Sequence, residues 1–520
     1  MASLPAFDLT DQSGRSRRFP TGRPTLLCFL KEECPTCALT APILRAAQAG
    51  LSGHADVWAV AQDADGGRAM ALRFGLEGPV LDDSALRVSF AYGLEAVPTV
   101  VLADEGGHER RRLVGFDRAG WQELLAALKL PGATAPAPID WEAYPASRPG
   151  CGSRSVEPGI AERLAAEAEG SPLRARRIEI GEADDPFELM FDQGLTDGLP
   201  VVPPTPARVL RMLGGTHRRP QEVVAVVPPN MGSATVEKVA INAVMAGCRP
   251  EYLPVVIAAV EAVCSDAFNI HGVLATTHFV GPVLIVNGPI RDRIGLNYRV
   301  NALGQGSRAN STIGRAVQLL VRNVGGGRPG EIDRAVLGQP GKLGFCFAEW
   351  EERSCWEPLH VERGFRADES TVTAFAGCAP TGIVDQLSRD GSSLATSYGL
   401  ALAAASHPRQ RGYGEVVLVV PPEHVDTFAR GDWTKARVRE QIQRASALPA
   451  RALARDRGCA IGLTGAEVER LGAETPVPKF RDADSIKLVV AGGEAGKFAA
   501  LIDNWAGGGG STMTTVRIEE

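Results

Sequence analysis

One stretch decides the fold of the first part of the chain: Pro24-Thr-Leu-Leu-Cys-Phe-Leu-Lys-Glu-Glu-Cys34-Pro35-Thr36-Cys37-Ala-Leu-Thr-Ala-Pro42. A short apolar run with strand character leads into a Cys-x-x-Cys pair, and helix-forming residues follow. We expect Cys34 at a helix N-terminus, where unpaired backbone N–H groups and the helix dipole favour its thiolate. Cys37 is expected one turn further on, where it can close a disulfide with Cys34.

A Cys-x-x-Cys pair also forms half of many structural zinc sites, which usually need four protein ligands. The chain has ten cysteines but no second Cys-x-x-Cys pair. The motif therefore favours redox chemistry over a zinc site.

Three motifs carry a resemblance over residues 1–130: the opening segment Leu4–Thr10, the Cys34–Cys37 site and Val97-Pro98-Thr99. With them, this part of the chain resembles the thioredoxin superfamily, near its TlpA/ResA and peroxiredoxin-like branch. The resemblance implies a cis Pro98 that packs beside the catalytic cysteines Cys34 and Cys37. The chain departs from the family at Glu33, where Trp is usual, and we expect this carboxylate to raise the pKa of the Cys34 thiol.

Length and composition set the general class. A chain of 520 residues is too long for one core, and three domains is a reasonable expectation. The net charge of −6 gives no reason to expect nucleic acid or anionic lipid as a partner. No apolar run approaches the roughly 20 residues that span a bilayer, and no secretion signal is recognised. We therefore expect a cytoplasmic protein whose thiols are kept reduced by a cellular thiol reductant.

The expected organisation is α/β throughout, with a thioredoxin-like N-terminal domain joined to a larger α/β region. Residues 131–150 hold many prolines without periodicity and are typical of a semi-extended linker. The predicted parts are a domain over 1–130, a linker with a connecting helix over 131–175, and two α/β halves over 176–405 and 406–520.

The two halves are predicted from an apparent repeat. Glu222-Val-Val-Ala-Val-Val-Pro-Pro229 matches Glu415-Val-Val-Leu-Val-Val-Pro-Pro422 at seven of eight positions. Each is a strand-like run that a proline pair ends, and each is followed later by a strand running into glycine, Pro282–Gly288 and Ile486–Gly493. The pattern favours a tandem duplication with the active site between the halves.

The densest group of reactive side chains lies between residues 345 and 360. Cys346 and Glu349 are three residues apart, which places them on one side of a helix or turn, and His360 is the base expected to activate Cys346. Glu357 completes this predicted C-terminal reaction centre. The same residue types suit a divalent metal, and a solvated acidic turn around a buried thiol is the plain structural alternative. Cys378 is the next candidate thiol.

An anionic substrate is expected near the glycine-rich loop 304–314, because backbone N–H groups at a helix start bind anions. The residues predicted to bind it are His278, Arg308, Asn310 and Lys497, the last at a helix start that resembles a phosphate loop but lacks its first glycine and its Ser/Thr.

The region 175–520 resembles an uncharacterised bacterial family associated with UGSC-type (seleno)proteins. The carrying segments are Asp197–Thr205, Ala243–Pro254, Val286–Pro289 and Trp356–His360. The resemblance implies thiol or selenol redox chemistry and supplies no established reaction. Cys151-Gly152-Ser153 is similar to the UGSC motif itself, but Arg154 replaces the final cysteine.

Two functions follow. In the first, the chain is a thiol-dependent redox enzyme whose Cys34/Cys37 pair supplies electrons to a C-terminal catalytic domain acting on a small, anionic substrate. In the alternative, the C-terminal domain is a metal-dependent lyase or hydrolase whose cysteines the first domain keeps reduced. A binding scaffold with a generic disulfide reductase is a weaker third hypothesis, and a homodimer is left open.

Overall fold

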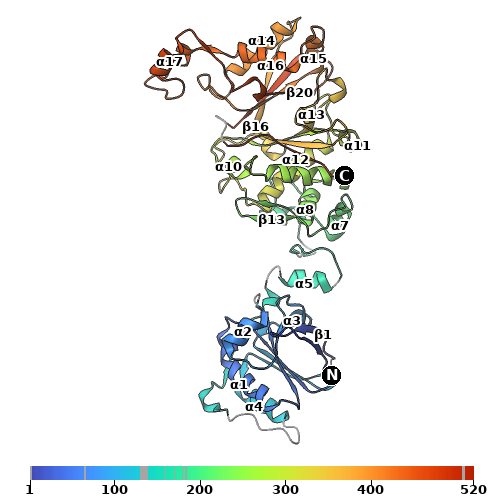
Figure 1. Cartoon of the computed structure of the whole chain (residues 1–520). Helices are drawn as coiled ribbons and strands as arrows, with labels where there is room; N and C mark the ends of the chain where they lie inside the picture. The colour runs from blue at the N-terminus through green and yellow to red at the C-terminus, as the bar shows by residue number, and fades with distance from the viewer. Residues whose placement is uncertain are drawn as a thin grey trace. The chain divides into compact units, whose positions relative to one another are not determined.

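The chain forms two compact units in a computed structural model: unit 1, Met1–Glu179, and unit 2, Ile180–Glu520 (Figure 1). The residues that the structure describes are 3–63, 66–128, 139–157, 160–168, 170–178, 180–181, 184–505 and 510–519.

Unit 1 is built on a five-stranded sheet with the order β5-β4-β3-β7-β8. β3 runs parallel to β4, β4 runs parallel to β5, and β7 is antiparallel to both β3 and β8. Every residue of β3 is buried, because its continuous apolar sequence meets the core on both faces of the sheet. The strands are β1 (Phe7–Thr10), β2 (Ser16–Phe19), β3 (Thr25–Leu30), β4 (Asp56–Ala61), β5 (Val80–Asp82), β6 (Ala96–Val97), β7 (Thr99–Ala103), β8 (Glu109–Val114) and β9 (Phe116–Asp117).

The helices of unit 1 complete the predicted arrangement, since α1 follows β3 directly, with the Cys-x-x-Cys pair at the junction. This order of parallel and antiparallel strands around that junction makes unit 1 thioredoxin-like, as the sequence predicts. The helices are α1 (Pro35–Gly50), α2 (Gly66–Phe74), α3 (Arg87–Ala91), α4 (Arg118–Ala127) and α5 (Ile160–Ala168).

The proline-rich segment is not a free linker over its described part. β10 (Ser147–Arg148) pairs with β9, and β11 (Cys151–Gly152) pairs with β6. Short 3-10 turns flank these strands at Trp141–Ala143 and Arg154–Val156. Residues 139–156 therefore pack on unit 1, while residues 131–138 of the predicted linker lie outside the described residues.

This docking makes a prediction for limited proteolysis. Trypsin should cut first after Arg176 or Arg177, which are exposed and lie outside helices and strands, and should release two folded pieces. Arg148 is also exposed, but it should resist because its backbone is paired in β10. A digestion time course read by mass spectrometry checks the order, with an Arg176→Gln/Arg177→Gln variant as the matched control. A first cut after Arg148 would show that the segment is not docked.

Unit 2 is built on one seven-stranded sheet. Six strands follow the order β15-β14-β16-β21-β17-β20, and β22 pairs with β16. β14 is parallel to β15 and β17 is parallel to β20, whereas the other pairs are antiparallel. The strands are β14 (Gly281–Asn287), β15 (Cys346–Ala348), β16 (Thr371–Val384), β17 (Val416–Val420), β20 (Ile486–Val490), β21 (Phe498–Asn504) and β22 (Thr514–Arg517).

Helices and small hairpins surround this sheet (Figure 1). α9 packs on β16 and β22, α12 packs on α8 and β15, and α14 packs on α16. The helices are α6 (Pro186–Asp192), α7 (Pro206–Leu213), α8 (Val236–Ala246), α9 (Leu253–Val263), α10 (Ile270–Ala275), α11 (Ile290–Arg293), α12 (Arg308–Asn323), α13 (Leu359–Glu362), α14 (Gly391–Ala403), α15 (Pro422–Ala429), α16 (Lys435–Ala445) and α17 (Gly465–Leu471). The hairpin β12 (Val223–Val227) with β13 (Gly232–Thr235) forms one two-stranded sheet, and β18 (Leu448–Pro449) pairs with β19 (Pro476–Val477) in another. Within the described residues no helix is long and apolar enough to cross a membrane.

The predicted duplication is not confirmed. β12 forms a separate two-stranded sheet with β13, whereas its sequence counterpart β17 is an inner strand of the large sheet. The predicted boundary at 405/406 does not separate two units either, because β16 of the first half pairs directly with β21 of the second. A cavity of about 360 Å³ is lined by both predicted halves, with residues 301–304 from the first and Val419, Gly492 and Phe498 from the second, so an active site between these segments stays a prediction.

Candidate active site

Cys34 and Cys37 lie where the sequence places them, at the start of α1. Cys34 is the N-cap residue of this helix, and its sulfur accepts a hydrogen bond from the Cys37 backbone N–H at 3.3 Å. The Val97–Pro98 peptide bond is cis, as the family resemblance implies. The carbonyl oxygen of Val97 lies 3.5 Å from the Cys34 sulfur, which places the two segments against each other.

A third cysteine, Cys151, completes this site. In the antiparallel pairing of β11 with β6, Cys151 is opposite Val97, the residue whose carbonyl faces Cys34. The Cys151 and Cys34 side chains are close enough for each to shift the pKa of the other. Cys151 is partly exposed, whereas Cys34 is 1% exposed and Cys37 is fully buried. The only signal for Cys151 in the sequence was its UGSC-like surroundings.

Hydrogen bonds hold the Cys151 segment in place from both sides. Lys31 Nζ donates to the carbonyl oxygen of Gly152 at 2.9 Å, and Thr36 Oγ1 donates to that of Pro149 at 2.9 Å. Behind them, the buried amide of Gln62 donates to Ser153 Oγ at 2.9 Å. The segment therefore has a fixed register over the Cys-x-x-Cys pair.

The three thiols have different acidities. Hydrogen bonds from the Cys37 and Cys151 side chains and from the Cys37 N–H stabilise the Cys34 thiolate and lower the pKa of Cys34 to about 5. Burial raises the pKa of Cys37, and the hydrogen bond to Cys34 raises the pKa of Cys151. The expected effect of Glu33 was wrong: this side chain is exposed, and the pKa of Cys34 moves in the opposite direction.

This acidity predicts a pH titration. Because the folded-state pKa of Cys34 is lowered, the thiolate should form as the pH rises through about 5 and persist above it. The thiolate absorbs in the ultraviolet, so the absorbance of the reduced chain minus that of a Cys34→Ser variant should rise around that pH. A midpoint near the ordinary thiol value of about 8.5 would contradict the assignment.

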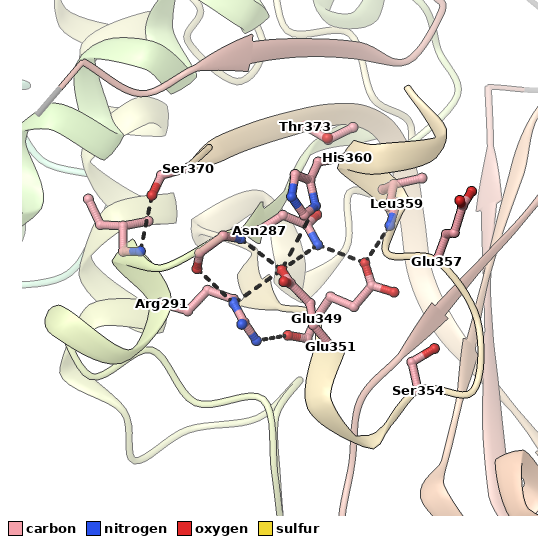
Figure 2. A network of polar contacts seen from close by, with 12 residues as sticks. Asn287, Arg291, Glu349, Glu351, Ser354, Glu357, Leu359, His360, Ser370 and Thr373 are labelled. Atoms are coloured by element: carbon pink, nitrogen blue, oxygen red, sulfur yellow. Dashed lines mark hydrogen bonds and ion pairs between the residues drawn. The ribbon is translucent and has the colours of Figure 1, made fainter. Parts of the chain in front are cut away.

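In unit 2, Glu349 and His360 lie in one buried polar network (Figure 2). Glu349 Oε2 accepts hydrogen bonds from Asn287 Nδ2 at 2.7 Å and from the Leu359 backbone N–H at 2.8 Å. His360 Nδ1 lies 3.9 Å from Glu351 Oε1. Burial raises the pKa of Glu349 and lowers the pKa of His360, so both side chains are driven toward their neutral forms.

Cys346 and Glu357 do not join this network. Cys346 lies in strand β15, which ends at Ala348, rather than on a helix or turn that would place it beside Glu349. Burial raises the pKa of Cys346, and the ionisable group that acts on this thiol is Cys248. Glu357 is exposed and points away from the network (Figure 2). The structure therefore does not bring a base to Cys346, and the predicted four-residue reaction centre is not assembled.

Two residues of the predicted anion site, Asn310 and Arg308, make contacts within the protein. Asn310 is 3% exposed, and its amide is used internally: Oδ1 accepts from the Asn297 N–H, and Nδ2 donates to the carbonyls of Asn297 and Ala302. It ties a loop to α12 and has no capacity left for a substrate. Arg308 is exposed and donates to the Gly247 carbonyl at 2.9 Å. Lys497 directly precedes β21, so the expected helix start is absent at that position.

His278 and Cys378 both lie near one half-buried carboxylate, Asp503. The charge of Asp503 acts on both side chains, and Tyr413 donates a hydrogen bond to Asp503 Oδ1 at 2.8 Å. Burial lowers the pKa of His278 and raises the pKa of Cys378 to about 12. Cys378 is therefore a protonated thiol at neutral pH and lacks the activation that Cys34 has.

Among the described residues, no group of three or more His, Cys, Asp or Glu side chains is placed to share a metal ion. The described residues therefore offer no set of metal ligands in support of the alternative, a metal-dependent lyase or hydrolase.

Comparisons with known proteins concern unit 1. StoA from Bacillus subtilis is 21% identical, with 24% of this chain and 96% of that chain covered and a TM-score of 0.21. The pneumococcal exposed lipoprotein thioredoxin Etrx1 from Streptococcus pneumoniae is 21% identical, with 24% and 98% covered and a TM-score of 0.22. Peroxidoxin BcpB from Mycobacterium tuberculosis is 21% identical, with 25% and 94% covered and a TM-score of 0.22.

No protein-family model matches the chain, and no curated protein matches it. The resemblance of residues 175–520 to a UGSC-associated family therefore stays a prediction. Unit 1 is a thioredoxin-like domain on the evidence of its strand order, its Cys-x-x-Cys junction and the segment before Pro98.

Proposed function

We propose that the chain is a thiol–disulfide oxidoreductase whose reaction takes place at Cys34 and Cys37. The observation that carries the proposal is the Cys34 sulfur, an N-cap group that two neighbouring thiols and a backbone N–H stabilise as a thiolate. A thiolate is the nucleophile in thiol–disulfide exchange. Cys37 lies within reach to form a disulfide with Cys34 and release a bound substrate thiol.

Unit 2 is proposed to receive the electrons, since one chain carries both units. Its exposed thiol is Cys355, which lines a cavity of about 730 Å³ with Trp356, Trp433 and Lys435. We also propose that the substrate of unit 2 is small and anionic. Among the residues predicted to bind it, Arg308 is the exposed cation. The reducing, cytoplasmic setting and the thiol reductant that would restore Cys34 and Cys37 are proposed with it.

A single-turnover experiment tests the oxidoreductase. The full chain is reduced, freed of reductant and mixed with glutathione disulfide, and the products are quenched in acid. We expect release of glutathione and a new Cys34–Cys37 disulfide, located by peptide mapping. A chain that releases no glutathione would contradict the proposal. Metal analysis of the same preparation addresses the alternative: bound metal in equal amount to the chain would revive the lyase or hydrolase hypothesis.

A further inference from the structure

Three cysteines rather than two meet at the reaction centre of unit 1. β11 brings Cys151 opposite Val97, whose carbonyl oxygen lies 3.5 Å from the Cys34 sulfur. Cys151 and Cys34 are both free thiols, and each shifts the pKa of the other. A disulfide needs two cysteines held close together with their side chains facing each other, and this pairing of backbones supplies the proximity.

Access distinguishes the three thiols. Cys34 is 1% exposed and Cys37 is fully buried beneath the segment that carries Cys151. Cys151 is the partly exposed member of the group, so a disulfide from solution meets its sulfur first. The contacts of Lys31 and Thr36 with the backbone on either side of Cys151 keep it at this position.

We propose that Cys151 is a third redox thiol of this site. It reacts first with a disulfide from solution, and a Cys34–Cys151 disulfide then transfers the oxidation to the Cys34–Cys37 pair. The inference deepens the proposed oxidoreductase function and rests on it. The substrate class is a disulfide R–S–S–R of a small thiol compound or an exposed protein cysteine.

The exchange steps balance. The Cys151 sulfur attacks R–S–S–R as its proton passes to the Cys34 thiolate, which forms Cys151–S–S–R and expels RS⁻. Cys34 gives this proton to RS⁻, which leaves as the first RSH, and Cys34 is again a thiolate. The Cys34 thiolate attacks the Cys151 sulfur, the bond to the R sulfur breaks, and the electron pair leaves with RS⁻, which takes up a proton to give the second RSH. Cys37 then attacks the Cys34 sulfur, returns Cys151 as a thiol and leaves a Cys34–Cys37 disulfide for an external dithiol to reduce.

The charges around Cys151 favour transfer of the disulfide from Cys151 to the Cys34–Cys37 pair. The Cys34 thiolate holds Cys151 protonated while the site is reduced, and this effect ends when Cys34 enters a disulfide. The Lys31 ammonium and the Thr36 backbone N–H then favour the Cys151 thiolate, so Cys151 is a good leaving group when Cys37 attacks.

The test uses the full chain with Cys37→Ser, which removes the last step. After reduction and treatment with glutathione disulfide, peptide mapping should find a Cys34–Cys151 disulfide and two released glutathiones per chain. The double variant Cys37→Ser/Cys151→Ser should lose this internal disulfide. Cys37→Ser/Cys459→Ser is the matched control, since Cys459 is a partly exposed thiol of unit 2 outside both proposed reaction centres, and it should keep the disulfide.

The outcomes separate the inference from the function on which it rests. If Cys37→Ser keeps glutathione on Cys34 or Cys151 and forms no bond between them, the relay is overturned while the oxidoreductase stands. If neither cysteine reacts with glutathione disulfide in the wild-type chain or in Cys37→Ser, the proposed function itself fails. The single variant retains Cys151, so this test does not depend on the folding of the double variant.

Discussion

Replacing Cys34 with serine is expected to abolish disulfide reduction by the full chain, with turnover falling on the order of a thousand-fold or more. The reason is the acidity of the site: Cys34 is a thiolate above about pH 5, whereas a serine hydroxyl stays protonated and is a far weaker nucleophile. Reduction of insulin in the presence of dithiothreitol measures the turnover. A Cys34→Ser chain that keeps wild-type turnover would remove Cys34 from the reaction.

The matched control is Cys459→Ser, which removes a partly exposed thiol from unit 2 and should leave turnover unchanged. Cys37→Ser separates the first step from the later ones. It should retain the initial burst of substrate thiol and lose steady turnover. The reason is that Cys37 is required to release the substrate bound to Cys34 in the mixed disulfide. Equal loss of burst and turnover in this variant would mean that Cys37 also supports the first attack.

Local sequence order was sufficient to predict the start of unit 1. The apolar run, the Cys34–Cys37 spacing and the Val97-Pro98-Thr99 segment are local patterns, and they lie in β3, at the start of α1 and at the junction of β6 and β7. The docking of Cys151 depends instead on the pairing of β11 with β6, which is more than fifty residues earlier in the chain. The prolines of the segment exclude a helix there. They do not indicate which strand of the domain the extended segment will pair with.

The repeated sequence in unit 2 shows the same limit. β12 and β17 have nearly identical sequences, yet β12 is mostly exposed or half-buried while every residue of β17 is buried. Strand propensity reflects the surface on which a strand packs, so identical runs need not occupy equivalent places. Cys346 illustrates an error of the assumed secondary structure: a helix or turn would place Cys346 beside Glu349, whereas Cys346 lies in strand β15, which ends at Ala348.

The second large effect concerns Arg291, which is 3% exposed within the network of Figure 2. Its guanidinium donates to the backbone carbonyls of Gly288 at 2.9 Å and Glu349 at 2.6 Å. It also pairs with Glu351 Oε1 at 3.2 Å and with Glu352 Oε1 at 2.7 Å. The cation therefore joins β14 and α11 to the segment after β15.

Arg291→Met is expected to lower the free energy of unfolding of unit 2 by about 3–5 kcal/mol, because it leaves the largely buried Glu351 carboxylate without its cation. Urea unfolding read by the proteolytic release of unit 2 peptides measures the change. Arg444→Met is the matched control: this exposed arginine lies 3.9 Å from Glu440, and its loss should cost less than about 0.5 kcal/mol.

A second substitution identifies the cause. If the cost of Arg291→Met comes from the stranded charge, adding Glu351→Gln should recover at least about 1 kcal/mol. The amide oxygen of Gln can still accept the hydrogen bonds that Glu351 Oε1 receives from Asn287 Nδ2 and the Gly288 N–H. If the double variant is instead less stable than Arg291→Met by as much as Glu351→Gln alone destabilises the protein, the two side chains act independently. The network would then depend on the carbonyl contacts of Arg291 rather than on its charge.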